Sequence, residues 1–106
     1  MDGRVRRLVE FLQNEWRTSV RVGDLAGRVG LGASRLEHLF KRDTNMSIRD
    51  FIRERRLVEA ARLLASTDHC VIRISFDAGF PDLSHFNHAF KKRFGLTPLR
   101  YRQSVR

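Results

Sequence analysis

The 106-residue chain has little of several residue types, and each shortage excludes a class of protein. Its one cysteine, Cys70, allows no disulfide within the chain and fits a reducing compartment. It has two prolines and no serine- or glycine-rich stretch that would indicate a disordered linker. No apolar run is long enough to cross a membrane, and the first residues lead into an amphipathic segment, not a signal peptide. We therefore expect one small, soluble, cytoplasmic domain.

The sequence also lacks the groupings of residues that catalysis or metal binding requires. No Ser/His/Asp set, glycine-rich phosphate loop or cluster of carboxylates is visible, so we expect no enzyme activity. His85 and His88 are one helical turn apart and His69 precedes Cys70, but no second ligand pair follows at a zinc-finger spacing. We expect no metal, no other cofactor and no small-molecule effector site in this chain.

Acidic residues are the next shortage, because 12 Asp and Glu stand against 21 Lys and Arg. The formal net charge is +9 and the sequence pI is near 11.3. Lysine occurs only at positions 41, 91 and 92, so the other 18 basic residues are arginine, whose planar fork suits phosphates and guanine edges. Such a charge predicts a polyanionic partner, although membrane-surface and RNA-binding proteins share it.

What the chain does have is an internal repeat. Residues 25–47 align with residues 74–97 after one single-residue insertion. The turn pair Gly30-Leu31 matches Gly79-Phe80, and Phe40 matches Phe90. Each copy reads as a helix, a tight glycine turn and a second helix, which is the sequence form of a helix-turn-helix unit.

Hydrophobic periodicity predicts helices throughout, so the fold class is all-α with about seven helices. They are expected at residues 4–16, 22–29, 33–42, 48–65, 71–78, 82–93 and 98–104. The first helix-turn-helix is placed at about 22–42 and the second at about 71–93, with the long helix 48–65 joining them. Gly30 and Gly79 are expected to supply left-handed turns, as are Asn45 and Gly95 at the ends of the second helices.

Short capping signals mark where two of these helices begin. Ser47 to Asp50 has the form of a capping box, in which both side chains bond to exposed backbone donors. Thr97-Pro98 combines a side-chain cap with a proline at the first helical position.

The second repeat resembles a family signature. Asp77-Ala78-Gly79-Phe80 with Ser84 and Phe86, then Phe90-Lys91, Gly95, Pro98 and Tyr101-Arg102, is similar to the pattern of AraC/XylS-type transcriptional regulators. The first repeat fits through Leu25-Ala26, Gly30-Leu31 and Leu39-Phe40-Lys41, and the joining helix through Arg56-Leu57 and Ala60-Ala61. The resemblance covers roughly residues 5 to 103.

The resemblance implies that residues 1–106 are an AraC-type DNA-binding domain. Members present two recognition helices, held by the joining helix, to successive major-groove segments of double-stranded promoter DNA. Most are activators that help to recruit RNA polymerase, which is therefore a further expected partner. Many carry a separate effector-binding or dimerisation domain, so the chain resembles either a stand-alone member or the DNA-binding portion of a longer regulator.

The family's base-reading positions can be carried over to both recognition helices. They are Ser34, Arg35, Glu37 and His38 in the first helix, and Leu83, Ser84, Asn87 and His88 in the second. Such side chains can hydrogen-bond to base edges or contact a thymine methyl group. The alternative is that they form only the solvated faces of two amphipathic helices.

Basic residues outside these reading faces are candidates for phosphate contacts. They are Arg17, Arg21, Lys41, Arg42, Arg49, Lys91, Lys92 and Arg93. Lys41 and Lys91 occupy equivalent places in the repeat, which favours equivalent roles. Those near helix C-termini also complement the helix dipole, and both roles can hold at once.

Two departures from the family pattern concern helix stability. Arg21 and Cys70 stand where a Ser or Thr cap is usual, and neither is a good cap. Ser75 replaces a small inner residue, and its hydroxyl is expected to bond to the carbonyl four residues earlier.

Two functions remain open on the sequence. The first is a sequence-specific transcription regulator that binds double-stranded DNA, with no membrane contact. The second is a non-enzymatic basic helical module that binds acidic partners or membrane surfaces.

Overall fold

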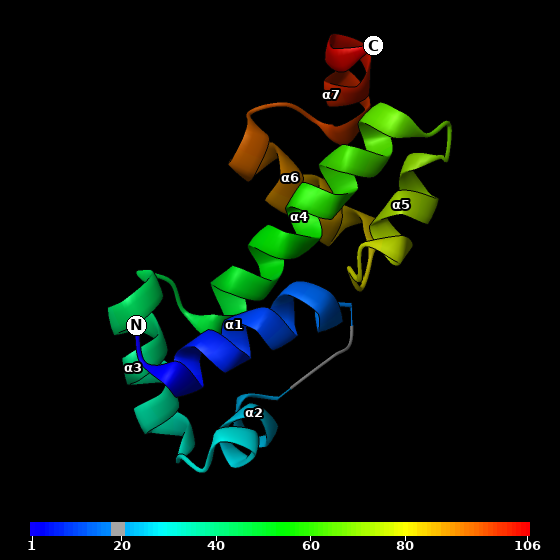
Figure 1. Cartoon of the computed structure of the whole chain (residues 1–106). Coiled ribbons are helices and arrows are strands. Elements are labelled where there is room, and N and C mark those ends of the chain that lie inside the picture. Colours follow the sequence, from blue (N-terminus) through cyan, green and yellow to red (C-terminus); the bar gives the residue numbers. More distant parts are fainter. Residues whose placement is uncertain (18–20) are drawn as a thin grey trace. The chain divides into compact units, whose positions relative to one another are not determined.

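The computed structural model describes residues 1–17 and 21–106, which form seven helices and no strand (Figure 1). The helices are α1 (Gly3–Glu15), α2 (Val22–Val29), α3 (Ala33–Thr44), α4 (Ile48–Ser66), α5 (Val71–Asp77), α6 (Leu83–Phe94) and α7 (Pro98–Val105). The all-α fold with two helix-turn-helix units and a long central helix is confirmed. The helix ends predicted from the sequence differ from the observed ends by at most two residues.

The chain divides into two compact units, residues 1–53 and 54–106, and the boundary lies inside α4. In the first unit, Val5, Leu8 and Leu12 of α1 are buried together with residues of α2 and α3. Ile48 and Phe51, from the beginning of α4, complete this core.

In the second unit, α5, α6 and α7 are arranged around the C-terminal half of α4 (Figure 1). Leu57, Ala60 and Leu64 of α4 supply its share of the core. Their spacing equals that of Val5, Leu8 and Leu12 in α1, so this half of α4 serves the second unit as α1 serves the first. The first turn of α4 likewise corresponds to the start of α7. Ser47 and Thr97 hold the same position before each helix, and each is followed by a buried residue, Ile48 or Pro98.

Both tight turns have the predicted geometry. Gly30 follows α2 with φ +72° and Gly79 follows α5 with φ +84°, the left-handed region that favours glycine. The next residue closes each turn, because the Leu31 N–H donates to the Ala26 carbonyl and the Phe80 N–H to the Ser75 carbonyl, both at 3.0 Å. Asn45 and Gly95 end α3 and α6 with φ +62° and +80°, as predicted.

The helix starts differ in how well they are capped. Arg21 and Cys70 make no side-chain cap, as their residue types predicted. Ser47 accepts from the Asp50 N–H at 3.0 Å, but the Asp50 carboxylate accepts from Arg53 at 2.6 Å. The described bonds therefore show one half of the predicted capping box.

The predicted bond of Ser75 is wrong in its acceptor. The buried hydroxyl donates to the carbonyl of Ile72, three residues earlier, at 2.8 Å. Helix α5 is only seven residues long and begins at Val71, so Ser75 lies within its first turns, where a three-residue spacing is common.

The connection from α4 to α5 is held by Arg102 of α7. Its guanidinium donates to the carbonyls of Leu64, Thr67 and His69 at 3.0, 3.2 and 2.6 Å. These bonds satisfy carbonyl groups at and beyond the end of α4, which have few helical donors left. Arg102 thus fixes the path that leads into the second helix-turn-helix. No described helix is long and apolar enough to cross a lipid bilayer.

Candidate nucleic-acid interface

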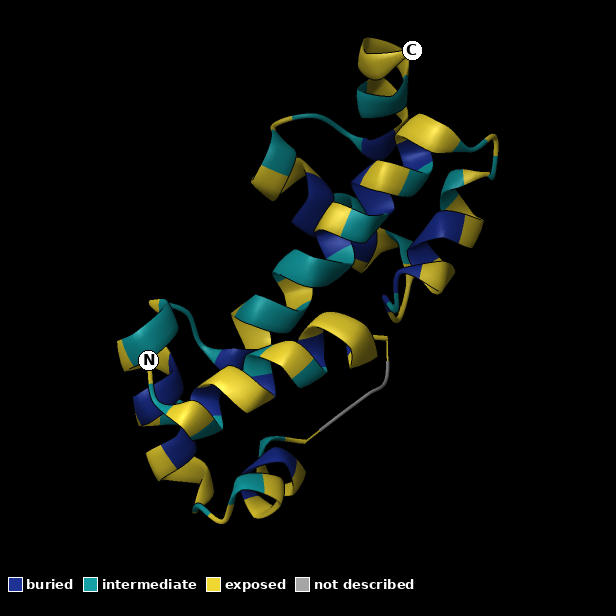
Figure 2. Ribbon diagram, viewed as in Figure 1, coloured by how far each residue is buried: buried dark blue, intermediate teal, exposed yellow. Residues whose placement is uncertain are grey.

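Helices α3 and α6 are the second helices of the two helix-turn-helix units, and they match residue for residue. Each has 12 residues, and every position in α6 is fifty residues after its counterpart in α3. The inward positions are buried in both: Leu36, Leu39 and Phe40 in α3, and Phe86, Ala89 and Phe90 in α6. Figure 2 shows this division, with buried residues on one side of each helix and exposed residues on the other.

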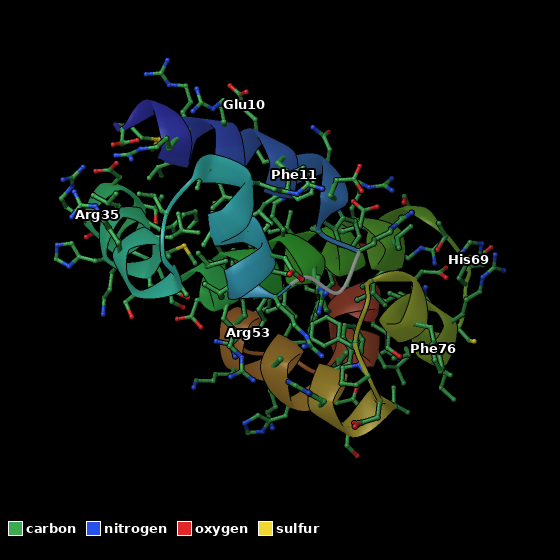
Figure 3. The ribbon with its side chains drawn as sticks, turned by 90° about the horizontal axis from the view of Figure 1, so that it is seen from below. Glu10, Phe11, Arg35, Arg53, His69 and Phe76 are labelled. Carbon is green, nitrogen blue, oxygen red and sulfur yellow. The ribbon has the colours of Figure 1, made fainter. Side chains whose placement is uncertain are left out.

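The exposed side of α3 carries the four residues predicted to read bases. Ser34, Arg35 and His38 are exposed, and Glu37 is half-buried. Arg35 points away from the ribbon at the outer edge of the helix (Figure 3). The structure therefore brings these four side chains together on one solvent-facing surface of the first unit.

The exposed side of α6 carries three of its four predicted residues in the same way. Ser84 and His88 are exposed and Asn87 is half-buried, which repeats the exposure of Ser34, His38 and Glu37. Leu83 differs, because it lies at the first position of α6 and packs partly against the core of the second unit. Only the exposed part of the Leu83 side chain could contact a thymine methyl group.

His85 belongs to the same surface, and the sequence interpretation missed it. It is exposed, corresponds to Arg35 in α3, and its ring lies edge-on to Phe80 with centroids 5.9 Å apart. Its backbone N–H donates to the carboxylate of Asp82 at 2.7 Å, which caps α6. The fifty-residue offset between Arg35 and His85 was the signal that could have identified it.

Basic residues cluster in the last turn of both helices. Lys41 and Arg42 of α3 and Lys91, Lys92 and Arg93 of α6 are all exposed. Two of them already have carboxylate partners: Arg42 lies 3.0 Å from Asp43, and Arg93 lies 2.8 Å from Glu54 and stacks over the ring of Phe94. Lys41, Lys91 and Lys92 are therefore the residues of this group with no such pair among the described contacts.

The other phosphate candidates lie at helix ends in the first unit. Arg17 follows α1, with its guanidinium 4.9 Å from the Trp16 ring centroid. Arg21 precedes α2 and Arg49 lies in the first turn of α4, and both are exposed. Residues 1–53 hold 11 basic and seven acidic residues, and residues 54–106 hold ten and five, so each unit by itself is positively charged.

The two arginines with carboxylate partners have pKa values above the ordinary value of arginine. Hydrogen bonding to Glu54 raises the pKa of Arg93, and hydrogen bonding to Asp43 raises that of Arg42. The Arg42 guanidinium, followed by the Asp2 backbone N–H, lowers the pKa of the Asp43 carboxyl below its usual range. The Asp2 N–H lies 2.9 Å from that carboxylate and so ties the start of α1 to the end of α3. Across the described residues, no three His, Cys, Asp or Glu side chains are grouped to hold a metal ion.

Known proteins share this arrangement. The family described as "Helix-turn-helix domain" matches residues 25–104. The chain is 33% identical to the HTH-type transcriptional regulator ExsA of Pseudomonas aeruginosa over 93% of its length, and 31% identical to the HTH-type transcriptional activator RhaS of Escherichia fergusonii over 96%. It spans only 36% and 37% of those two proteins.

A solved structure gives the same fold. The DNA-binding domain of AdpA, described as a global transcriptional factor in complex with a target DNA, superposes with a TM-score of 0.91 at 21% identity. The match covers 99% of this chain and 95% of that one. With the family match over residues 25–104 and the two helix-turn-helix units, the chain belongs to the AraC/XylS family of helix-turn-helix transcription regulators.

Proposed function

We propose that this chain binds double-stranded promoter DNA sequence-specifically and presents α3 and α6 to successive segments of the major groove. The observation that carries the proposal is the contrast between the two sides of these helices. The same positions are buried in both helices, whereas outward-facing positions differ at Arg35 and His85 and at Glu37 and Asn87. A solvated face is polar in any amphipathic helix, but here it belongs to the second helix of a helix-turn-helix unit, the element that enters the major groove.

The residues proposed to read bases are Ser34, Arg35, Glu37 and His38 on α3, and Leu83, Ser84, Asn87 and His88 on α6. His85 joins them because it occupies the position of Arg35 and is equally exposed. Arg and His can donate to guanine, Asn can bond to both polar groups of an adenine edge, and Glu can accept from cytosine. These residues supply donors, acceptors and an apolar contact, which is what discrimination between base pairs needs.

Phosphate contacts are proposed for Lys41, Lys91 and Lys92 first, and then for Arg17, Arg21, Arg42, Arg49 and Arg93. The three lysines are exposed at the C-terminal ends of the helices that read bases. Arg42 and Arg93 would exchange a carboxylate partner for a phosphate, so their net contribution is smaller.

Regulatory function is proposed from the relatives. RhaS is named a transcriptional activator, and the sequence similarity extends over nearly all of this chain. We infer that residues 1–106 act as the DNA-binding domain of an activator, with helix-turn-helix units at about 22–42 and 71–93 and the joining helix between them. RNA polymerase is the proposed protein partner at the promoter.

The test is selection of bound duplexes from a random pool, followed by affinity measurements on the selected duplex. A shuffled duplex, the separated single strand and anionic vesicles serve as the other arms. We expect the selected duplex to bind more tightly than all three. Equal binding to the shuffled duplex or to vesicles would instead favour a basic module that recognises charge alone.

A matched pair of variants separates base reading from charge. Arg35→Ala and Arg7→Ala remove the same charge from exposed sites of the first unit, but only Arg35 lies on α3. Arg35→Ala should lower the affinity for the selected duplex far more than the affinity for the shuffled one. Arg7→Ala should lower both slightly and equally.

A further inference from the structure

Lysine is rare in this chain, and its three residues share one kind of position. Lys41 lies in the last turn of α3, and Lys91 and Lys92 lie in the last turn of α6. All three residues are exposed, and none has an ion pair among the described contacts. The other 18 of the 21 Lys and Arg residues are arginine. The side-chain amines of the chain are therefore confined to the ends of the two proposed recognition helices.

This distribution separates two kinds of side-chain chemistry. An arginine guanidinium stays protonated at neutral pH, whereas a lysine amine can lose its proton and attack an electrophilic carbon. Acetylation of the amine removes its positive charge. Among the basic side chains, a reagent that acylates amines therefore changes those of α3 and α6 alone.

A histidine precedes a lysine by three residues in both helices. His38 stands before Lys41 and His88 stands before Lys91, and all four residues are exposed. Residues three apart on a helix are surface neighbours, with about 5 to 6 Å between their Cβ atoms. A neutral imidazole so placed can accept the proton that the amine must lose as it attacks. Each helix thus carries a nucleophile next to a base.

The residue four positions before each lysine differs in charge. Glu37 holds this place before Lys41, and the uncharged Asn87 holds it before Lys91. Side chains four residues apart also share one face of a helix. An anionic reagent therefore meets a carboxylate beside Lys41 but not at the matching place beside Lys91.

The residue after each lysine adds to this difference. Lys92 follows Lys91 and has no carboxylate partner among the described contacts, so its ammonium is available to hold an anion. Its counterpart in α3 is Arg42, whose guanidinium lies 3.0 Å from Asp43. A small anion is therefore attracted more strongly to the end of α6 than to the end of α3.

We propose that Lys91 is a site of Nε-acylation by a small acyl phosphate, with Lys92 holding the anionic donor and His88 accepting the proton. The Lys91 nitrogen attacks the carbonyl carbon, an N–C bond forms, and the C–O bond to phosphate breaks. Phosphate leaves with the electron pair of that bond, and the amine proton passes to His88 and then to solvent. The product is a neutral amide. Lys41 is the same kind of site, slowed by Glu37.

Acylation and DNA then compete for the same amine. Lys91 is a proposed phosphate contact, so this consequence rests on the proposed function. Loss of one phosphate contact should lower the magnitude of the salt slope by about 0.9 and, at about 0.15 M salt, lower the affinity for the selected duplex about fivefold. Bound DNA should in turn shield the amine from the donor. A rising supply of activated acyl groups would therefore release the chain from its site.

The experiment treats the full chain, without DNA, with acetyl phosphate and follows each lysine by peptide mass spectrometry. The reference amine is the lysine introduced by Arg100→Lys, at an exposed position of α7 with no histidine or acidic residue three or four positions away. We expect Lys91 to react about tenfold faster than this reference, below the gain of about 10² to 10⁴ that a positioned base gives in enzymes. Lys41 should lie between the two. Equal rates for Lys91 and the reference overturn the proposal.

Paired variants test the base within one molecule. His88→Gln should slow acetylation of Lys91 and leave Lys41 unchanged, and His38→Gln should do the reverse. Glu37→Gln should raise the rate at Lys41 towards that at Lys91. If His88→Gln slows neither lysine, exposure alone explains the reaction and the proposed site is wrong.

A second arm measures DNA binding. Acetyl phosphate should lower the affinity of the chain for the selected duplex, and Lys91→Arg combined with Lys92→Arg should lose most of this sensitivity, with each protein compared with its own untreated sample. Lys41 and the N-terminal amine remain in that variant and account for the rest of the effect. Prior addition of the selected duplex should slow acetylation of Lys91 more than a shuffled duplex does.

The outcomes separate this inference from the proposed function. If no duplex is preferred, the proposed function fails, while fast acetylation of Lys91 that depends on His88 still supports the site. If the selected duplex is preferred but neither protects Lys91 nor binds less tightly after its acetylation, Lys91 lies away from DNA and the proposed competition is wrong.

Discussion

Tyr101 meets Phe90 edge-on, with their ring centroids 5.3 Å apart and their planes at 77°. In the other unit, Phe51 meets Phe40 in the same way, at 5.5 Å and 86°. In each pair, a residue that follows α3 or α6 in the chain contacts a buried residue of that helix, and the two pairs are fifty residues apart. The repeat thus extends beyond the helix-turn-helix to a contact that packs against the buried side of its second helix.

Removing either of these rings should destabilise its own unit. Tyr101→Ala and Phe51→Ala each remove a half-buried aromatic side chain and an edge-to-face contact, so we expect a loss of about 2 to 3 kcal/mol. Urea unfolding measures the loss, and amide hydrogen exchange shows which unit opens. Leu99→Ala, which truncates an exposed residue of α7, should cost much less. Equal costs for Tyr101→Ala and Leu99→Ala would contradict this packing role.

The two turn glycines should tolerate substitution poorly. Gly30→Val and Gly79→Val should each cost at least about 1 to 2 kcal/mol, because a β-branched residue resists positive φ. Thermal unfolding provides the measurement. Unchanged melting temperatures in both variants would mean that these positions are not left-handed in solution.

Alanine should distinguish the two turns. A Cβ at Gly79 would lie 3.1 Å from Nε of Arg56, whereas a Cβ at Gly30 would meet no described atom within 4 Å. Both substitutions place alanine at positive φ, so the extra cost of Gly79→Ala over Gly30→Ala measures the displacement of Arg56. A cost at Gly30 equal to or larger than that at Gly79 would exclude this steric contribution.

Much of this fold followed from local sequence rules. Hydrophobic periodicity located all seven helices, and glycine or asparagine marked the left-handed positions, because these signals depend on neighbouring residues alone. Apolar residues along α4 predicted contacts with both halves, and the two cores confirm them. The correspondence of its C-terminal half to α1 did not follow from the helix-turn-helix repeat, since it rests on spacing and only Leu12 and Leu64 share a residue type. The three carbonyl contacts of Arg102 and the Arg93–Glu54 pair join residues more than thirty positions apart, which periodicity cannot reveal.

The candidate site, too, could be predicted from the sequence only in part. Exposure of Ser34, Arg35 and His38 followed from the helical period, but the partial burial of Leu83 depends on how the second core closes. His85 could have been predicted by applying the fifty-residue offset to Arg35. The choice of bases stays a prediction, because it depends on DNA contacts.

Acid should weaken the link between α1 and α3. The Asp43 carboxyl has a pKa below its usual range because Arg42, and then the Asp2 N–H, stabilise the charged form. A lowered folded-state pKa gives stability that is fully present above the ordinary carboxyl pKa of about 4 and is lost as pH falls through the folded value. The urea midpoint of the first unit should therefore fall below pH 4. Asp43→Asn should lower the urea midpoint at pH 7, and its midpoint should fall less between pH 7 and pH 3 than that of the unmodified chain. An equal fall in both proteins would mean that groups other than Asp43 cause the acid sensitivity.

Binding to DNA should depend strongly on salt. If about six to eight basic groups meet phosphates, the slope of log affinity against log salt should be about −5 to −7. Each of Lys41→Gln and Lys91→Gln should reduce its magnitude by about 1, whereas Arg42→Gln should reduce it less because Arg42 also leaves a carboxylate. A slope near −2 for the unmodified chain would mean that its charge is scattered and not gathered on a binding face.

The two recognition helices should read different bases within one asymmetric site. A palindromic site arises when identical subunits present identical helices about a two-fold axis. Helices α3 and α6 are not identical: they share Ser34/Ser84 and His38/His88 but differ at the other proposed reading positions. Glu37→Ala with Arg35→Ala should relax base preference in one segment of the selected site. Asn87→Ala with His85→Ala should relax it in another segment, about one turn of the duplex away. Selection from random duplexes with each variant measures both effects. A symmetric site bound only by dimers, or relaxation of the same base pairs by both variants, would contradict recognition by two different helices of one chain.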